Sequence, residues 1–233
     1  MARLKRMVIP GFWRVPRKEK KWVVAPRPGP HRKLDSVPLQ VLVRDVLGIL
    51  EKGKEARTII KRGEILIDGK KRKDHAYPVG LFDVVSVPAT GKNYRAVPSK
   101  KTLSFVEIPV GDAKHKLCKI VGKTVVTKGK MQVNLHDGKN LLVDKKEFKT
   151  GDSLLLSLPD LKIIEHIPLE PGVTGIVTRG ADVGKIGKVK EVMHATSKEH
   201  ARVICDFDGG EEEVLKDRFF VLGKGKSAIN VGE

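Results

Sequence analysis

Cationic side chains gather in three stretches of the sequence, and their chemistry suits the phosphates of a nucleic acid. The first stretch, residues 1–33, contains eleven Lys and Arg residues against one acidic residue, Glu19. Lysine binds phosphate as a point charge, and arginine can donate two parallel hydrogen bonds to it. Phe12, Trp13 and Trp22 lie among these cations, and aromatic rings can stack on RNA bases. The candidate RNA contacts in this arm are Arg14, Arg17, Arg27, His31, Arg32 and Lys33.

The arm also allows a structural interpretation, in which its tryptophans pack against the arm's own domain. We expect both to hold, with one Trp docking the arm while the basic side chains face outward. The prolines of APRPGPHRK (25–33) exclude a helix there, because each removes a backbone donor and favours extended geometry in the residue before it. We expect this ribbon to bury little of itself and to become ordered on the surface that it binds.

A second cationic stretch joins a short helix to a hairpin. In KEARTIIKRG (54–63) the helical period places Ala56, Ile59 and Ile60 on one face and cations on the opposite face. Gly63 is expected to end this helix in the left-handed conformation, and the Asp-Gly pair that follows predicts a type I′ hairpin turn. A solvated helix face is the alternative interpretation. Lys54, Arg57 and Lys61 lie on that cationic face, and Lys70, Lys71 and Arg72 follow the turn.

The third stretch, TRGADVGKIGKV (178–189), places cations around three glycines. It lacks the GKS or GKT of a nucleotide-binding P-loop, and the following KVKEVMH alternates like a strand, which excludes a dinucleotide fingerprint. Glycine lets a partner approach the backbone closely, and cations pair with phosphate. A tight loop that needs glycine only for its turns is the alternative. The candidate contacts are Arg179, Gly180, Lys185 and Lys188.

No arrangement of residues suggests catalysis or a resident metal. The seven histidines are scattered without an HExxH spacing, and Cys118 and Cys205 lie far apart without a CxxC spacing. Glu211, Glu212 and Glu213 would alternate sides of a strand, so a solvated edge or a contact with a basic protein suits them better than acid–base work. We therefore expect that the protein is not an enzyme, and that it has no catalytic residues, no cofactor and no metal site.

The whole chain is basic, which indicates a polyanionic partner. Its 233 residues include 46 Lys and Arg against 28 Asp and Glu, a formal net charge of +18. The arm alone carries a net +10, over half of that excess. No apolar run reaches the length of a membrane span, and no secretory signal is recognisable. We expect a cytoplasmic protein with reduced, buried thiols.

Five segments are expected to present these cations. Apolar residues at helical spacing in PLQVLVRDVLGIL (38–50) predict a helix that Pro38 starts. After the second helix and a small sheet, short strand-like runs alternate with turns from 101 to 168 and from 172 to 222, which predicts two small β-barrels. The expected fold class is α+β, with a basic arm (1–37), an RNA-binding domain and linker (38–100), a central β-barrel (101–171), a second small β-barrel (172–222) and a polar tail (223–233).

Four segments in this order resemble the S4e family of small-subunit ribosomal proteins of archaea and eukaryotes. RMVIPGFWRVPRKEKKWVVAPRPGPHRK resembles the amino-terminal signature of that family, and residues 38–88 look like an S4 RNA-binding domain. KLCKIVGKTVVTKGKMQVNLHDGK is similar to the family's central barrel, and TGIVTRGADVGKIGKV resembles a KOW motif. The carboxyl end is shorter than we expect for eukaryotic members, which favours an archaeal source.

The resemblance implies a structural constituent of the small ribosomal subunit, located in the cytoplasmic ribosome. Its partners would be small-subunit ribosomal RNA, bound through phosphate and shape contacts, and neighbouring ribosomal proteins, with no membrane and no small-molecule substrate. It would support subunit assembly and translation. The family pattern places RNA contacts of the S4 domain on the second helix and basic hairpin, which in this chain implies Lys54, Arg57, Lys61, Arg62, Lys70, Lys71 and Arg72. Many S4 domains begin that helix with a Ser-Arg pair, where this chain reads GKEAR.

Two other functions fit parts of the sequence. An RNA-modifying enzyme could use an S4 domain to anchor its substrate, but it would also need a catalytic domain. A transcription elongation factor could carry the KOW motif, but this would explain neither the arm nor the S4 domain.

Overall fold

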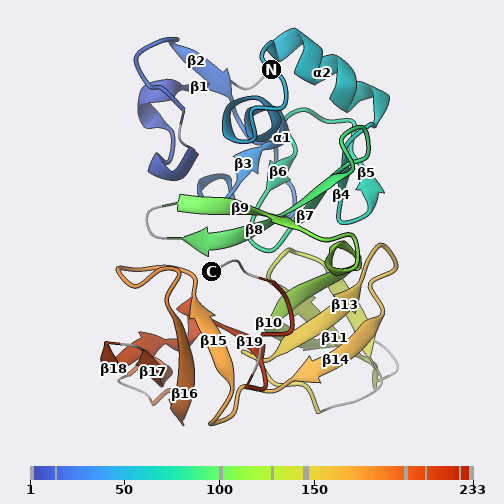
Figure 1. Cartoon of the computed structure of the whole chain (residues 1–233). Helices are drawn as coiled ribbons and strands as arrows, with labels where there is room; N and C mark the ends of the chain where they lie inside the picture. The colour runs from blue at the N-terminus through green and yellow to red at the C-terminus, as the bar shows by residue number, and fades with distance from the viewer. Residues whose placement is uncertain are drawn as a thin grey trace. The chain divides into compact units, whose positions relative to one another are not determined.

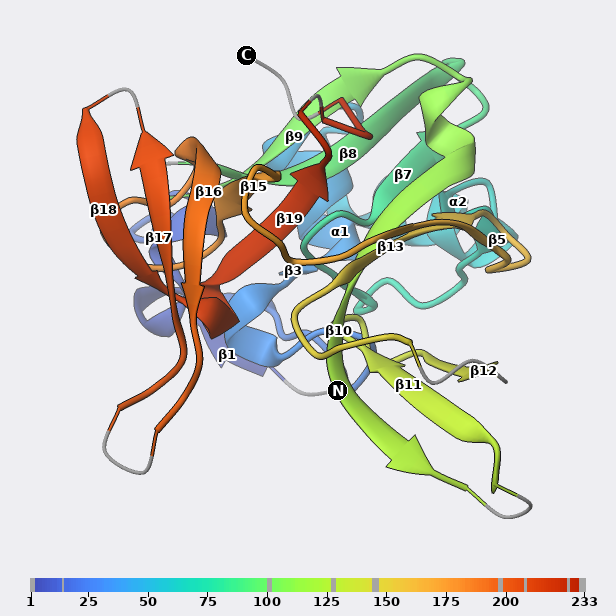
Figure 2. The same cartoon turned by 90° about the horizontal axis from the view of Figure 1, so that it is seen from below.

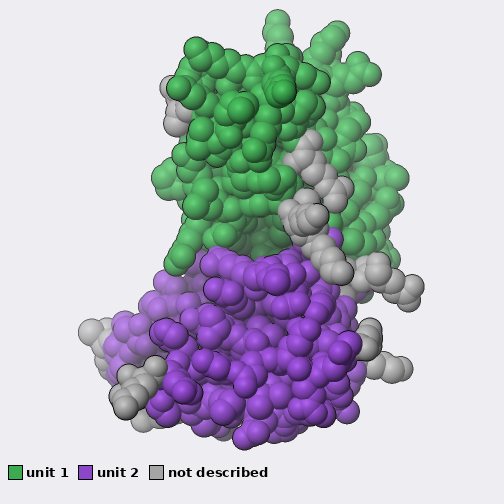
Figure 3. Space-filling model, turned by 90° about the vertical axis from the view of Figure 1, so that its left-hand side faces the viewer, with its two compact units in different colours: residues 1–97, 101–114 green, residues 98–100, 115–233 purple. Residues whose placement is uncertain are grey.

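The computed structural model describes residues 3–13, 15–99, 102–126, 129–143, 147–196, 199–207, 209–225 and 227–230. The chain forms two compact units, which Figure 3 colours separately. Unit 1 comprises residues 1–97 and 101–114, and unit 2 comprises residues 98–100 and 115–233. Unit 1 combines helices with small sheets, and unit 2 is built mainly of strands (Figure 1), which confirms the α+β class. None of the helices in the described ranges is long and apolar enough to cross a membrane.

The basic arm is a folded part of unit 1. Strand β1 (Arg3–Lys5) pairs antiparallel with β2 (Trp22–Val24), and 3-10 turns occupy Arg6–Val8 and Gly11–Trp13 between them. The Trp13 side chain is fully buried, and its indole Nε1 donates a hydrogen bond of 2.9 Å to the carbonyl oxygen of Ser36. Trp22 remains 42% exposed. The expectation that one tryptophan docks the arm is confirmed.

The arm nevertheless buries more of itself than we expected. Apolar residues recur along it, so that its backbone can stay irregular while its side chains enter the core of unit 1. Each fully buried valine- or isoleucine-sized side chain contributes about 1.5–3 kcal/mol. Of the segment 25–33, residues 25–32 contain no helix, as the prolines predicted, whereas Lys33 begins a 3-10 turn (Lys33–Asp35). Arg27 N donates to Ala76 O at 2.9 Å. The arm side chains that are at most 7% exposed include Ile9, Trp13, Val15, Val23 and Ala25.

The first helix is shorter than the predicted span 38–50. Helix α1 (Leu39–Val41) continues directly as a π-helix over Leu42–Val46. Pro38 does not start it, because it belongs to strand β3 (Val37–Pro38), which pairs with β6 (Pro78–Val79). Gly48 follows with a φ of 64°, a left-handed conformation that ends the helical path. The predicted apolar face is buried through Leu39, Leu42 and Val43.

Helix α2 (Gly53–Arg62) and the hairpin after it form as predicted. Gly63 ends the helix with a φ of 77°, and its N–H donates to Ile60 O at 2.9 Å. Strand β4 (Leu66–Ile67) then pairs with β5 (Lys70–Lys71) across Asp68 and Gly69, whose φ values are 52° and 72°. Two positive φ values are what a type I′ turn requires, so the prediction from the Asp-Gly pair is confirmed.

These strands belong to a five-stranded sheet in the order β5-β4-β7-β8-β9. Its other members are β7 (Val84–Val87), β8 (Lys92–Ser99) and β9 (Thr102–Ile108). The segment boundary that we expected between residues 100 and 101 thus falls between neighbouring strands of one sheet. Strand β9, which the sequence suggested as the start of the central barrel, lies in unit 1.

The first sheet of unit 2 has the order β12-β11-β10-β13-β14. The long strand β10 pairs with β13 through its first half and with β11 through its second half. Figure 2 shows β10 and β11 extending as a hairpin beyond the β13 pairing. The hydrophobic core of this sheet includes Cys118, Ile120, Val133 and Leu154. The strands are β10 (His115–Val125), β11 (Met131–Leu135), β12 (Asn140–Val143), β13 (Ser153–Ser157) and β14 (Ile163–Ile167).

The second sheet of unit 2 has the order β18-β17-β16-β15-β19. Cys205 is buried in it, and burial raises the pKa of this thiol to about 12, so it stays protonated and unreactive at neutral pH. Cys118 is also buried, and neither cysteine forms a disulfide. The strands are β15 (Thr174–Val177), β16 (Ile186–Met193), β17 (Arg202–Phe207), β18 (Gly210–Leu215) and β19 (Phe219–Gly223).

A buried lysine connects the two sheets of unit 2. Lys119 lies on β10, and its Nζ donates to the carbonyl oxygens of Lys216, Asp217 and Phe219 at 2.7, 3.1 and 2.8 Å. Burial lowers the pKa of Lys119 to about 8, against a smaller raising effect of Asp217. Three carbonyl acceptors match the three donors of an ammonium group, which offsets part of the cost of its burial.

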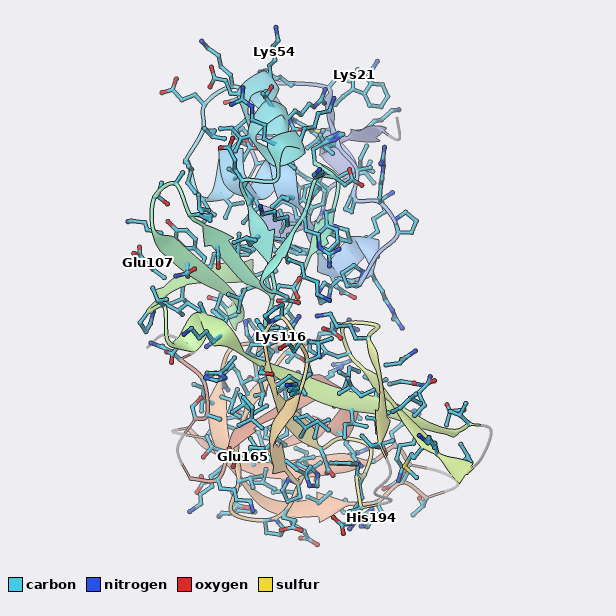
Figure 4. All side chains as sticks on the ribbon, turned by 90° about the vertical axis from the view of Figure 1, so that its right-hand side faces the viewer. Lys21, Lys54, Glu107, Lys116, Glu165 and His194 are labelled. Carbon is cyan, nitrogen blue, oxygen red and sulfur yellow. The ribbon has the colours of Figure 1, made fainter. Side chains whose placement is uncertain are left out.

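A buried ion pair involves another lysine of β10, Lys116. Lys116 Nζ, labelled in Figure 4, is 3.1 Å from Asp137 Oδ2, and both side chains are 0% exposed. Lys139 Nζ approaches the same oxygen at 2.9 Å. Burial alone would raise the pKa of Asp137, but Lys116, His136 and Lys139 lower it well below its usual range.

Candidate nucleic-acid interface

The outward face of α2 presents cations because its apolar residues face the core. Ala56 and Ile60 are fully buried, whereas Lys54, Lys61 and Arg62 are exposed. Figure 4 shows the Lys54 side chain pointing away from unit 1. Arg62 lies 3.7 Å from Glu64, an exposed pair in which screening by water leaves the guanidinium accessible.

Arg57 lies on the same helix but is half-buried. Its Nε donates to Gln40 Oε1 at 3.0 Å, and Gln40 Nε2 donates to Gly53 O at 3.0 Å. This chain of hydrogen bonds fixes the guanidinium beside the first turn of α2, at the GKEAR corner where the sequence departs from the family pattern. Arg57 is therefore held in position by hydrogen bonds, unlike the exposed lysines around it.

The hairpin places further cations beside the end of α2. Lys70 and Lys71 are exposed on β5. A Cβ on Gly63 would lie 3.6 Å from Lys71 Cβ, so the hairpin packs directly against the helix end. The cations of α2 and β5 therefore form one surface. We call it the helix–hairpin surface, and it comprises Lys54, Lys61, Arg62, Lys70 and Lys71.

Tyr77 and His75 lie beside cations of α2 and the basic hairpin and respond to their charge. The guanidinium of Arg72 lies 4.6 Å from the centre of the Tyr77 ring, a cation–π contact that holds its plane. The pKa of His75 is lowered, first by burial and then by the charge of Arg57, with smaller effects of Arg27 and Lys61. Asp74 opposes them without reversing the direction. Positive potential thus gathers on this side of unit 1.

The predicted contacts of the arm fall into different environments. Arg17, Arg32 and Lys33 are exposed, although Arg17 also donates to Ile9 O at 3.3 Å. Arg27 is exposed and forms an ion pair of 3.2 Å with Asp74. Arg14 lies outside the described residues.

His31 is in the interior of unit 1. Its Nε2 lies 2.9 Å from Asp83 Oδ2, and both side chains are at most 5% exposed. Gly80 makes room for the imidazole, because a Cβ there would lie 2.3 Å from His31 Cγ. A histidine held in this way cannot reach a phosphate on the surface, so we remove it from the candidate contacts.

A polar hollow of about 400 Å³ lies between the arm and the start of α2. Its lining comes from the arm, the first helix and the segment that leads into α2. Sequence reasoning missed these residues, because the hollow exists only once the arm has docked. They are Arg6, Glu19, Lys20, Arg44, Asp45, Glu51, Lys52 and Gly53.

The glycine loop of unit 2 is less available than the sequence suggested. Lys185 Nζ is 2.7 Å from both Asp182 Oδ1 and Glu212 Oε1, and the hydrogen bonds to these carboxylates raise its pKa. Its charge is therefore neutralised within the protein. Gly180 has a φ of 114°, so this position needs glycine for its backbone conformation. Arg179 and Lys188 are exposed.

The three adjacent glutamates pair with cations across the second sheet. Glu212 binds Lys185, Glu211 binds Lys190, and Glu213 Oε2 is 2.7 Å from Arg202 Nη1. The sequence showed the acidic run but not its partners, because these depend on the register of β16, β17 and β18. The described residues contain no group of three His, Cys, Asp or Glu side chains placed to hold a metal ion.

Comparison with known families matches three stretches of the chain. Residues 2–34 match the RS4NT (NUC023) domain, residues 37–85 match the S4 domain, and residues 90–163 match the model described as Ribosomal family S4e. The arm and the helix–hairpin surface thus each fall within a family model, and the third model runs from β8 and β9 of unit 1 through most of the first sheet of unit 2.

Relatives resemble nearly the whole chain, and a solved structure resembles most of it. A protein of Methanothermobacter thermautotrophicus named small ribosomal subunit protein eS4 is 44% identical, with 98% of this chain and 95% of the relative covered. Its counterpart in Archaeoglobus fulgidus is 43% identical, with 98% and 97% covered. The crystal structure of the 30S ribosomal protein S4e from Thermoplasma acidophilum superimposes with a TM-score of 0.71 at 30% identity, covering 83% of this chain and 97% of that one. The chain therefore belongs to the S4e family of ribosomal proteins.

Proposed function

We propose that this protein is a structural constituent of the small ribosomal subunit and binds small-subunit ribosomal RNA through unit 1. The observation that carries the proposal is the packing of Lys71 against Gly63, which merges the cations of α2 and β5 into one surface. Supporting it, the relatives are named as small-subunit proteins. A surface on which cations predominate suits the phosphate backbone of folded RNA.

The contacts divide by how firmly each group is held. Lysines of the helix–hairpin surface supply exposed charge, and Arg57 and Arg72 offer guanidinium planes held by Gln40 and Tyr77. Arg17, Arg27, Arg32 and Lys33 extend the contact along the arm, and Arg179 and Lys188 supply a separate contact from unit 2. Lys185 is not included, because two carboxylates already neutralise it.

The role in the ribosome follows from this mode of binding. Phosphate contacts distributed over two units let one protein hold RNA segments that are distant in sequence, which favours subunit assembly and so supports translation. The surfaces away from RNA would meet neighbouring ribosomal proteins. No chemical step is required of the protein.

Charge reversal on the helix–hairpin surface tests this proposal. The triple variant Lys54→Glu, Lys61→Glu and Lys70→Glu changes only exposed side chains, and it avoids Arg57, whose hydrogen bond to Gln40 contributes to the fold. A control with the same net charge reverses three exposed lysines of unit 2, Lys130, Lys149 and Lys162.

The readout is affinity for small-subunit ribosomal RNA over a series of salt concentrations. The unmodified protein should lose roughly 0.7–0.9 log units of affinity per log unit of salt for each phosphate neutralised. The helix–hairpin variant should bind more weakly and with a shallower salt slope, and the control should resemble the unmodified protein. Equal losses in the two variants would mean that net charge alone matters, and the proposed surface would be rejected.

A further inference from the structure

We infer that Trp22 is a stacking site for an unpaired nucleobase of RNA, flanked by Lys5 and Lys21. The inference rests on the proposed RNA-binding function and names one ligand for it. The observations are the exposure of this indole, its place on the arm hairpin, the cations around it and its connection to α2.

The strand register accounts for the exposure of the Trp22 ring. In the β1–β2 pair, Leu4 lies opposite Val23 and both turn toward the core, whereas Lys5 lies opposite Trp22 on the other face. Val23 is 7% exposed and Trp22 is 42% exposed. Neighbouring residues of a strand point to opposite faces, so Trp22 cannot join the core without a slip of register. The ring is thus held at the surface by the hairpin itself.

Cations border the ring. The Lys21 ammonium lies 5.5 Å from the ring centre, within the range of a cation–π contact. Lys5 is exposed and directly opposite across the strands, a position that brings side chains on the same face into contact. A nucleotide offers a flat base for the indole and a phosphate for a lysine, so this arrangement complements both parts of it.

The site is rigid enough to orient a ligand before binding. Arg6, which is 4% exposed, donates from Nη1 to Pro16 O at 2.7 Å, and its backbone N–H donates to Lys21 O at 3.0 Å. Trp13 anchors the same segment to Ser36. These hydrogen bonds hold the segment before Trp22 at Pro16 and at Lys21. A base that stacks on Trp22 therefore need not order the arm first.

The site is continuous with the proposed RNA surface. Lys20, two residues before Trp22, lines the polar hollow together with Lys52 and Gly53 at the start of α2. Figure 4 shows Lys21 and Lys54 at the same end of unit 1. An RNA strand that follows the exposed face of α2 thus reaches the arm beside Trp22. A protein partner would have to offer both an acidic group for the lysines and a surface that packs on the indole ring of Trp22.

The two tryptophans of the chain make a direct test possible, because Trp13 is buried and Trp22 is exposed. The probes are an RNA hairpin with an adenosine loop, the same stem with an abasic loop, and a fully paired duplex. The adenosine loop should quench tryptophan fluorescence of the full chain, and the other two should not. Trp22→Leu should abolish the quenching and weaken binding of the adenosine loop by roughly 5- to 150-fold, the range for loss of one stacked base. Trp22→Phe should retain part of the affinity.

Controls separate this inference from the function on which it rests. Leu34→Ala removes another exposed apolar side chain of unit 1, at 69% exposure, and should change neither quenching nor affinity. The Lys54/Lys61/Lys70 reversal should weaken all three probes equally. If Trp22→Leu binds the adenosine loop normally while the triple reversal weakens it, the stacking site is refuted and RNA binding stands. If the triple reversal has no effect either, RNA binding itself fails. If Trp22→Leu lowers only incorporation into subunits, Trp22 meets a protein and the inference is overturned.

Discussion

The ammonium of Lys119 should make the stability of unit 2 depend on pH above neutrality. Burial lowers the pKa of this lysine from 10.5 to about 8 in the folded chain. Between these values the unfolded chain holds a proton that the folded chain has released, so a rise in pH favours the folded state. The contribution is complete above the unfolded pKa and is lost as the pH falls through about 8.

The magnitude follows from that difference. Raising the pH from about 7 to about 10 should stabilise the unmodified protein by ~2–3 kcal/mol relative to Lys119→Met, which has no proton to release. The Met variant leaves three carbonyl oxygens without their donor at every pH, so the difference between the proteins, and not either value alone, carries the test. Lys162→Met, at an exposed position, should follow the pH dependence of the unmodified protein.

The assay is urea unfolding at each pH, followed by circular dichroism and by tryptophan fluorescence. Both tryptophans lie in unit 1, so the fluorescence change reports unfolding of unit 1. A change in circular dichroism that occurs without a change in fluorescence reports unfolding of unit 2. A free-energy difference between the unmodified protein and Lys119→Met that stays constant from about pH 7 to about pH 10 would refute the reasoning. It would mean that the ammonium is not desolvated between the sheets.

Three further substitutions test the packing of each unit. Asp137→Asn should destabilise unit 2 by about 3–5 kcal/mol in urea unfolding, because Lys116 would stay buried without its counter-charge. A loss of stability below about 1 kcal/mol would mean that the ion pair is exposed to solvent. Trp13→Ala should cost unit 1 about 3–5 kcal/mol and lower its thermal midpoint, and an unchanged midpoint would argue against docking of the arm. Gly175→Ala should destabilise unit 2 in the same measurement, since a Cβ there would lie 2.2 Å from the Phe219 ring. Normal stability of this variant would contradict the close packing of β15 on β19.

Elements fixed by local chemistry could be predicted from the sequence. Helix α2 ends at Gly63 and the next turn uses Asp68 and Gly69, because the left-handed conformations there suit these residue types. The first helix was predicted too long, since its apolar pattern continues past Val46 while the backbone turns away at Gly48. A hydrophobic pattern identifies a buried face but does not locate the end of a helix.

The sequence indicated which residue types gather in the candidate site, but not which partners they have. The clusters of Lys and Arg on α2 and β5 were evident from spacing. The burial of His31 beside Asp83 and the pairing of Lys185 with Glu212 were not, because these contacts join residues far apart in sequence. Lys20 and Lys52 were missed for the same reason. Which cations remain available to a ligand is decided by tertiary structure.

Docking of the arm through Trp13 has a consequence for deletion experiments. The segment that holds most of the excess positive charge also supplies Ile9, Trp13, Val15 and Val23 to the core of unit 1. Domains are stable by only about 5–15 kcal/mol, and loss of these four side chains would remove a comparable amount. A chain shortened by the arm would therefore lose affinity for RNA whether or not a single arm cation touches RNA. Substitution of surface charges one at a time, with the apolar anchors left in place, separates recognition from folding.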